Sequence, residues 1–159
     1  MSIQVGDAIP SVELQEGNPG NKVNAAEMMA SGKSVVFAVP GAFTPGCSKT
    51  HLPGYVQDAD AIKAKGVDRI VCISVNDVFV MNAWGENQGV GDKIHMLADY
   101  AADFTRAIGL DVDASGVLGN VRSKRYSMIV EDGKVTALNV EPDGFGLSCS
   151  LAPALLEQL

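Results

Sequence analysis

The chain has 159 residues, of which 47% are hydrophobic and 19% are charged, and this balance is typical of one globular domain, expected over residues 1–159. Its 19 acidic and 12 basic side chains give a net charge of −7, which argues against binding to nucleic acid or to an anionic membrane, because both require a basic surface. The first ten residues do not resemble an export signal, and the longest apolar run, residues 35–39, is far shorter than the ~20 residues that span a bilayer. We therefore expect a soluble, intracellular protein.

Predicted strands and helices alternate along the first part of the chain. A polar turn at residues 17–21 precedes a buried strand at 34–39, and apolar residues at helical spacing then predict a helix from Leu52 that ends at Gly66. A second buried strand is expected at 70–75, followed by a helix at 78–87 that Asp77 caps, with a polar connection at 85–91. A weaker strand at 94–98 and a short helix at 101–108 complete this alternation.

The end of the chain has a different pattern. Residues 126–130 and 134–140 flank Asp132-Gly133, which predicts a β-hairpin, and residues 151–159 predict a helix with Pro153 in its first turn. The alternation followed by a hairpin predicts an α/β protein of the thioredoxin-like class: a mainly parallel central sheet, antiparallel strands at one side, and helices on both faces. Functional residues in such sheets gather at the carboxyl ends of strands, which directs attention to the segment after Val39.

That segment contains a helix start with a cysteine in its first turn. Thr44 is a good N-cap residue, and Pro45 suits the first helical position, where no backbone N–H is needed. Cys47 then lies where unpaired N–H groups and the helix dipole favour an anion, and Lys49 adds a positive charge. We expect these features to lower the pKa of the Cys47 thiol and to make it reactive. Pro53 follows within the predicted helix, which must therefore either bend or restart at Leu52.

The stretch from Pro40 to Gly54 resembles the peroxidatic-cysteine motif of the peroxiredoxins, and most closely that of the atypical two-cysteine group, also called peroxiredoxin-five or type II. The resemblance extends over the whole chain. Four other segments also match the group, and they are residues 5–10, 74–77, 124–128 and 139–144.

The resemblance implies a thioredoxin fold and reduction of hydrogen peroxide and small organic hydroperoxides without a cofactor or metal. By position, Cys47 is the peroxidatic cysteine and Cys149 the resolving cysteine. Thr44 is expected to hydrogen-bond the thiolate and the peroxide, Arg125 to hold both electrostatically, and Pro40 to shield the pocket. Because Cys149 lies in a loop rich in Gly, Asp and Ser, we expect it to be exposed and mobile.

The resemblance also implies partners and a compartment. Thioredoxin is the implied reductant, and the chain is expected to form a homodimer. Members of the group that enter peroxisomes end in Ser-Gln-Leu, whereas this chain ends in Glu157-Gln158-Leu159, so a cytoplasmic or mitochondrial location is favoured over a peroxisomal one.

The other chemically active side chains have simpler interpretations. Cys72 is expected to be a packed core thiol, Trp84 a packing residue and His95 structural. His51 lies four residues after Cys47, where it either forms an ion pair with the thiolate or stays on the helix surface.

Four other functional classes also use cysteine and serve as alternatives to be compared with this sequence. A dithiol oxidoreductase requires Cys-x-x-Cys, but Thr stands at positions 44 and 50. The spacing of the Cys and His residues matches no zinc pattern, and a cysteine hydrolase has only His95 as a candidate base. The alternative that remains is a redox-sensing binding protein without significant turnover, in which oxidation of Cys47 changes a surface that a partner recognises.

Overall fold

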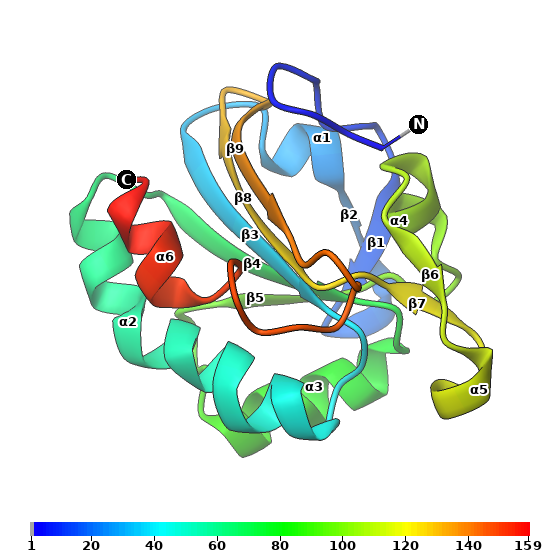
Figure 1. The fold of residues 1–159 in the computed structure, drawn as a ribbon. Helices are drawn as coiled ribbons and strands as arrows, with labels where there is room; N and C mark the ends of the chain where they lie inside the picture. Colours follow the sequence, from blue (N-terminus) through cyan, green and yellow to red (C-terminus); the bar gives the residue numbers. More distant parts are fainter. Residues whose placement is uncertain (1) are drawn as a thin grey trace.

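The computed structural model describes residues 2–159, and its centre is a seven-stranded sheet with the strand order β2-β1-β5-β4-β3-β8-β9 (Figure 1). The three middle strands run parallel, and they are β3 (Lys33–Val39), β4 (Arg69–Ser74) and β5 (His95–Ala98). The predicted hairpin forms β8 (Tyr126–Glu131) and β9 (Lys134–Val140), which lie antiparallel beside β3. The structure confirms the thioredoxin-like α/β fold.

The opposite edge of the sheet is a hairpin that the sequence did not suggest. Strands β1 (Glu13–Glu16) and β2 (Asn18–Asn24) pair antiparallel, and β1 also pairs antiparallel with β5. Within the segment predicted as a turn, Gly17 makes the turn at a φ of 83°, but the chain continues as a strand from the next residue. Pro19 is tolerated because β2 is an edge strand. The sheet is therefore mixed rather than mainly parallel.

Helices cover both faces of the sheet, as predicted. Three of them, α2 (Leu52–Ala64), α3 (Val78–Gln88) and α6 (Ala152–Glu157), pack on one face, whereas α1 (Ala25–Met28) and α4 (Asp103–Ala107) pack on the other. Alternate residues of a strand point to opposite faces, so β3 sends Val35, Phe37 and Val39 to the first core and Val36 and Ala38 to the second.

Several boundaries differ from those expected from the sequence. Helix α3 continues to Gln88, so part of the predicted 85–91 connection is helical, and Gly89 ends the helix at a φ of 70°. Helix α4 is shorter than the expected 101–108 because Ala102 before it is left-handed. Residues 111–123 form three short elements that were not predicted. These are β6 (Asp111–Asp113), α5 (Ser115–Leu118) and β7 (Val121–Ser123), with β6 and β7 paired in a separate sheet.

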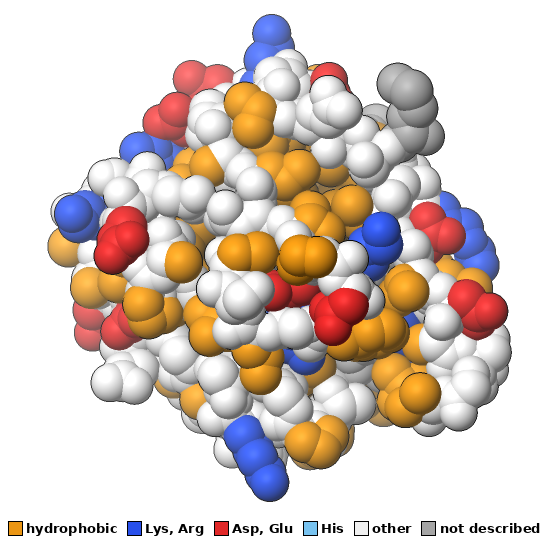
Figure 2. Space-filling model, in the orientation of Figure 1, with side chains coloured by type: hydrophobic (Ala, Val, Ile, Leu, Met, Phe, Trp, Pro, Cys, Tyr) orange, Lys and Arg blue, Asp and Glu red, His pale blue; other side chains and the backbone are white. Residues whose placement is uncertain are grey.

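The surface fits the acidic composition. In Figure 2, lysine and arginine side chains are scattered over the face shown, and several of them lie beside Asp or Glu side chains. None of the helices formed by residues 2–159 is both long and apolar enough to cross a membrane.

Candidate active site

A strained turn at the end of β3 leads into the first helical turn of the site. The Thr44 amide donates to the Gly41 carbonyl, and the exposed Phe43 between them has a left-handed φ of 64°, which is unusual for a bulky residue. The helix begins at Pro45, as predicted. The Thr44 hydroxyl, however, donates to the Gly41 carbonyl at 2.7 Å instead of accepting a helical N–H as an N-cap side chain does. Its lone pairs are therefore available to a substrate.

The helix changes its winding at Cys47. Residues Cys47–His51 form a π-helical turn, η1, closed by a hydrogen bond from the Leu52 N–H to the Cys47 carbonyl five residues back. Helix α2 then starts at Leu52, which places Pro53 in a first turn, where its missing N–H costs little. The helix thus restarts at Leu52, one of the two expected outcomes. Single π turns within helices often mark functional sites.

Cys47 and Arg125 meet inside the protein although they are far apart in the sequence. The Arg125 Nη2 atom donates to Cys47 Sγ at 3.4 Å, and the two residues are 4% and 0% exposed. Gly46 makes this approach possible, because a Cβ at that position would lie 3.2 Å from Nη2. A buried guanidinium at this distance can hydrogen-bond negative charge on the sulfur or on an atom bonded to it. Two of the residues predicted from the resemblance are therefore in direct contact.

His51 supports Arg125 rather than pairing with Cys47. Its Nδ1 lies 3.0 Å from Arg125 Nη1, and its Nε2 lies 3.1 Å from the Ser150 carbonyl oxygen. Because a guanidinium only donates, Nδ1 accepts, and the ring proton sits on Nε2 and is donated to Ser150. Burial, followed by the charge of Arg125, lowers the pKa of His51 to about 3, so the ring is neutral at physiological pH. Both sequence-based expectations for His51, an ion pair with Cys47 and a position on the helix surface, are wrong.

Pro40 lies beside a second arginine that sequence reasoning missed. Pro40 is buried, and its carbonyl accepts a hydrogen bond from Arg122 Nη1 at 3.3 Å. A Cβ at Gly41 would lie 3.0 Å from the same nitrogen, so glycine leaves room for this side chain. Burial lowers the pKa of Arg122, and the charge of Cys47 raises it. No local sequence pattern marks Arg122, because its approach to Pro40 depends on where the tertiary fold places β7.

Cys149 lies in a loop of residues 141–150, which we call the resolving loop. Its thiol is half-buried and points to the Val140 carbonyl at 3.5 Å, and all three cysteines are free thiols. The Glu141 carboxylate accepts from the backbone N–H groups of Ser148, Cys149 and Ser150 and from both serine hydroxyls. Burial, followed by the charge of Glu141, raises the pKa of Cys149. The expectation of an exposed thiol is therefore wrong, because Glu141 holds this part of the loop against the protein.

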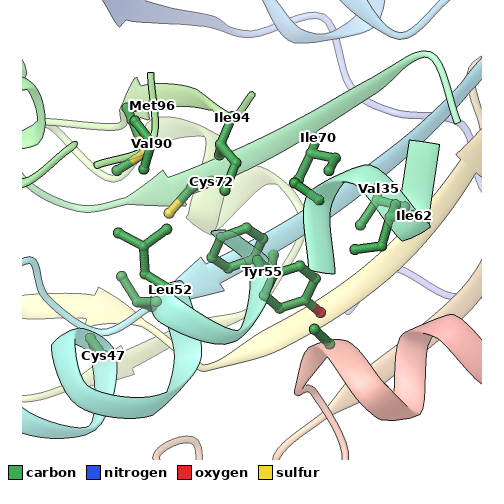
Figure 3. Close-up of a cluster of buried hydrophobic side chains, with 14 of the residues drawn as sticks. Val35, Cys47, Leu52, Tyr55, Ile62, Ile70, Cys72, Val90, Ile94 and Met96 are labelled. Carbon is green, nitrogen blue, oxygen red and sulfur yellow. The ribbon is translucent and has the colours of Figure 1, made fainter. Parts of the chain in front are cut away.

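The remaining candidates belong to the core or lie in other environments. Figure 3 shows Cys72 on β4 among the side chains of the core cluster that also includes Cys47. Cys72 is fully buried, as predicted, and burial raises the pKa of its thiol. Trp84 is also buried as predicted, and its Nε1 donates to the Ser48 hydroxyl at 2.9 Å. His95 pairs with Glu16, and within residues 2–159 no three His, Cys, Asp or Glu side chains converge on a possible metal site.

Known proteins resemble the chain over nearly its whole length. The Redoxin family model matches residues 4–148. Peroxiredoxin-2E-2, chloroplastic, from Oryza sativa subsp. japonica is 45% identical over 166 residues, which cover 99% of this chain and 73% of the rice protein. Peroxiredoxin-2B from Arabidopsis thaliana is 41% identical over 89% of this chain and 90% of its own.

Solved structures agree with these sequence matches. The structure of reduced Prx3 in complex with H₂O₂ from Vibrio vulnificus is 48% identical, has a TM-score of 0.91 and is matched over 98% of both chains. Peroxiredoxin 5 from Alvinella pompejana is 42% identical, with a TM-score of 0.85 over 98% of both chains.

Proposed function

Since the chain belongs to the peroxiredoxins, within the redoxin family, and is a peroxidase of the oxidoreductase class, we propose that it works by a two-cysteine mechanism. Cys47 reduces hydrogen peroxide and small organic hydroperoxides, Cys149 resolves the oxidised Cys47, and thioredoxin recycles the disulfide. The observation that carries the proposal is the 3.4 Å contact between Arg125 Nη2 and Cys47 Sγ in a buried site.

In the first step, the Cys47 thiolate attacks one oxygen of the peroxide. An S–O bond forms and the O–O bond breaks. The sulfur becomes a sulfenic acid, and the second oxygen leaves as water or an alcohol after taking up one proton from solvent, equal to the one that the Cys47 thiol released. Arg125 stabilises the negative charge as it moves from the sulfur to the leaving oxygen. A guanidinium keeps its proton in proteins, so it does not supply the proton for the leaving oxygen. The Thr44 hydroxyl donates its proton to the Gly41 carbonyl, so its oxygen is suited to accept a hydrogen bond from the peroxide.

In the second step, the Cys149 thiol attacks the sulfenic sulfur of Cys47. A disulfide forms, and the sulfenic oxygen leaves as water with the proton from Cys149. The dithiol of thioredoxin then supplies two electrons and two protons, which restores both thiols and leaves thioredoxin as its own disulfide.

Two further features stay predictions. We propose that one domain over residues 1–159 carries this activity as a homodimer, which light scattering of the purified protein tests. We also propose a cytoplasmic or mitochondrial location, whereas the rice relative is chloroplastic by name.

The test is peroxide consumption with thioredoxin as reductant, compared among the wild type, Cys47→Ser and Cys149→Ser. Cys47→Ser is expected to abolish consumption, because serine cannot form the thiolate nucleophile. Cys149→Ser is expected to complete one round of peroxide reduction and then lose turnover with thioredoxin. Mass spectrometry of the stalled variant should find an oxygen on Cys47 and no disulfide.

Other outcomes would each change a different part of the proposal. If Cys149→Ser turns over normally with thioredoxin, Cys149 is not the resolving residue and an external thiol takes its place. If the wild type reduces one equivalent of peroxide and then stops with every thiol reductant, the protein acts as a redox sensor rather than as a turnover enzyme.

A further inference from the structure

Arg125 is held in place largely by the resolving loop. Its Nε donates to the Phe145 carbonyl at 3.3 Å, and its backbone N–H donates to the Gly144 carbonyl at 2.8 Å. Both acceptors lie in the loop that carries Cys149. The group that activates the peroxidatic thiol is therefore attached to the segment that carries the resolving thiol.

A second set of hydrogen bonds, through His51, also connects Arg125 to the resolving loop. The Ser150 carbonyl accepts from His51 Nε2 at 3.1 Å and from the Tyr55 hydroxyl at 2.8 Å, and His51 Nδ1 accepts from Arg125 Nη1. The ring packs tilted against Phe37 and edge-on against Tyr55, with centroids 5.1 and 5.5 Å away, so its remaining freedom is small. The Ser150 carbonyl thus fixes the ring orientation in which His51 accepts from Arg125.

Glu141 holds both of these connections between Arg125 and the resolving loop in place. Its carboxylate binds the N–H and the hydroxyl of Ser150 at 2.9 and 2.7 Å, and those of Ser148 at 3.0 and 2.6 Å. Its own backbone N–H donates to the Arg125 carbonyl at 3.0 Å. Burial opposes the charge, but the hydrogen bonds from Ser148 and Ser150 outweigh it and hold the pKa of Glu141 well below its usual range. The carboxylate is therefore ionised at any working pH.

This docked arrangement does not suit disulfide formation. Cys149 Sγ is turned to the Val140 carbonyl while Cys47 Sγ contacts Arg125, and the Cys149 backbone N–H is bound to Glu141. A disulfide needs the two sulfur atoms about 2.05 Å apart, whereas both thiols are free here and each faces a different partner, so we expect the loop to leave the Glu141 carboxylate before Cys149 attacks. When the loop leaves, His51 loses its hydrogen bond to the Ser150 carbonyl, and Arg125 loses its hydrogen bond to the Phe145 carbonyl.

We propose that Glu141 is a positioning residue whose hydrogen bonds keep the resolving loop docked and, through Phe145 and His51, hold Arg125 on Cys47. With the loop docked, His51 and Phe145 aim Arg125 at Cys47, and the thiol reacts with peroxide. With the loop released, Arg125 loses these supports and Cys149 is free to reach the sulfenic acid. The strength of the Glu141 contacts sets the balance between the two steps. This inference rests on the proposed role of Cys149 as the resolving thiol.

The test compares Glu141→Gln with the wild type in single-turnover experiments. Glutamine keeps one acceptor oxygen but turns an NH₂ group toward the loop donors, so the loop is held less firmly. The peroxide step should slow by about tenfold, less than the ~10²–10³ typical when such a donor is removed outright. Disulfide formation should become faster, by several-fold. Rapid quenching with a thiol label, read by mass spectrometry, follows both steps. Glu131→Gln is the matched control, because Glu131 is half-exposed and pairs only with Lys33 at the hairpin end.

Opposite changes in the two steps support the proposal, because simple damage to the fold would slow both. A parallel loss in both steps, or no change in either, would overturn it. The rate of the peroxide step is also compared between the single variant Cys149→Ser and the double variant Cys149→Ser/Glu141→Gln. This comparison separates the inference about Glu141 from the proposed function of Cys149. If Glu141→Gln slows the peroxide step there but Cys149 proves not to resolve Cys47, Glu141 positions Arg125 and only the coupling to resolution fails.

Discussion

Cys47 and Cys72 occupy the same core cluster but have opposite surroundings. Both are completely buried, and Figure 3 shows them on neighbouring elements, one on the turn before α2 and the other on β4. Cys72 is packed among apolar side chains, and burial raises the pKa of its thiol. Cys47 has the Arg125 guanidinium against its sulfur. Burial alone therefore does not distinguish the two cysteines. The proposed mechanism assigns the difference to a buried cation that is itself held by partners.

The largest expected effect removes that cation. In Arg125→Met the side chain keeps much of its apolar volume but loses every donor, so the surroundings of Cys47 become similar to those of Cys72. The rate constant for reaction with peroxide should fall by about 10²–10³-fold. Competition with a second peroxidase of known rate measures this, with circular dichroism to check the fold. A decrease of less than about threefold would mean that the guanidinium does not separate the two cysteines.

An intermediate effect concerns the neutral His51 that supports the guanidinium. Unfolded His51 binds a proton below pH 6.5, whereas in the folded protein its pKa is about 3, so the unfolded state binds more protons between these values. Stability is therefore complete above pH 6.5 and falls as the pH is lowered, by up to about 1.4 kcal/mol per pH unit. The lowered pKa of Glu141 adds to the loss only below its ordinary value of 4.5.

Urea unfolding between pH 5 and 6.5 isolates the contribution of His51. The midpoint should fall with pH in the wild type and become nearly independent of pH in His51→Gln. The variant His95→Gln removes the histidine that pairs with Glu16, and it should keep the slope. Equal slopes in the wild type and His51→Gln would show that His51 is not held neutral by its surroundings.

The smallest effect is expected at Cys72. Replacing it with alanine removes one buried sulfur from a closely packed core, at a cost of about 1–2 kcal/mol in the free energy of unfolding. The rate of peroxide reduction should stay within about twofold of the wild type, because no step of the mechanism uses this thiol. Thermal melting and single-turnover kinetics measure the two quantities. A large loss of peroxide reduction with an unchanged melting temperature would assign Cys72 a chemical role.

Local chemistry explains which parts could be predicted from the sequence. The buried strands and the helix start at Pro45 depend on neighbouring residues, so their patterns are visible in the chain itself. The edge strand β2 has Pro19 and Gly20 and is almost wholly exposed, so it has no apolar alternation to recognise. Its pairing with β1 stabilises it, and that pairing is a property of the fold.

The same distinction holds within the site. The local turn pattern predicts Cys47 as a candidate, whereas only the family resemblance points to Arg125, 78 residues away. The position of His51 cannot be predicted locally, because its two partners lie 74 and 99 residues away. No sequence pattern marks Glu141 as a functional residue, although it lies in a matching segment. Its carboxylate binds Ser148 and Ser150, and nothing in the sequence indicates that the chain turns back to it.

The contact between Trp84 and Ser48 has a practical consequence. Trp84 is the chain's single tryptophan, and its indole N–H is hydrogen-bonded to Ser48, directly after Cys47. Its emission therefore comes from one place, which contacts the turn that carries Cys47. Any rearrangement of this turn that breaks the bond to Ser48 changes the surroundings of the indole. The protein thus contains its own fluorescent probe, and any stage of the proposed redox cycle that rearranges this turn can be timed in a stopped-flow instrument without an added label.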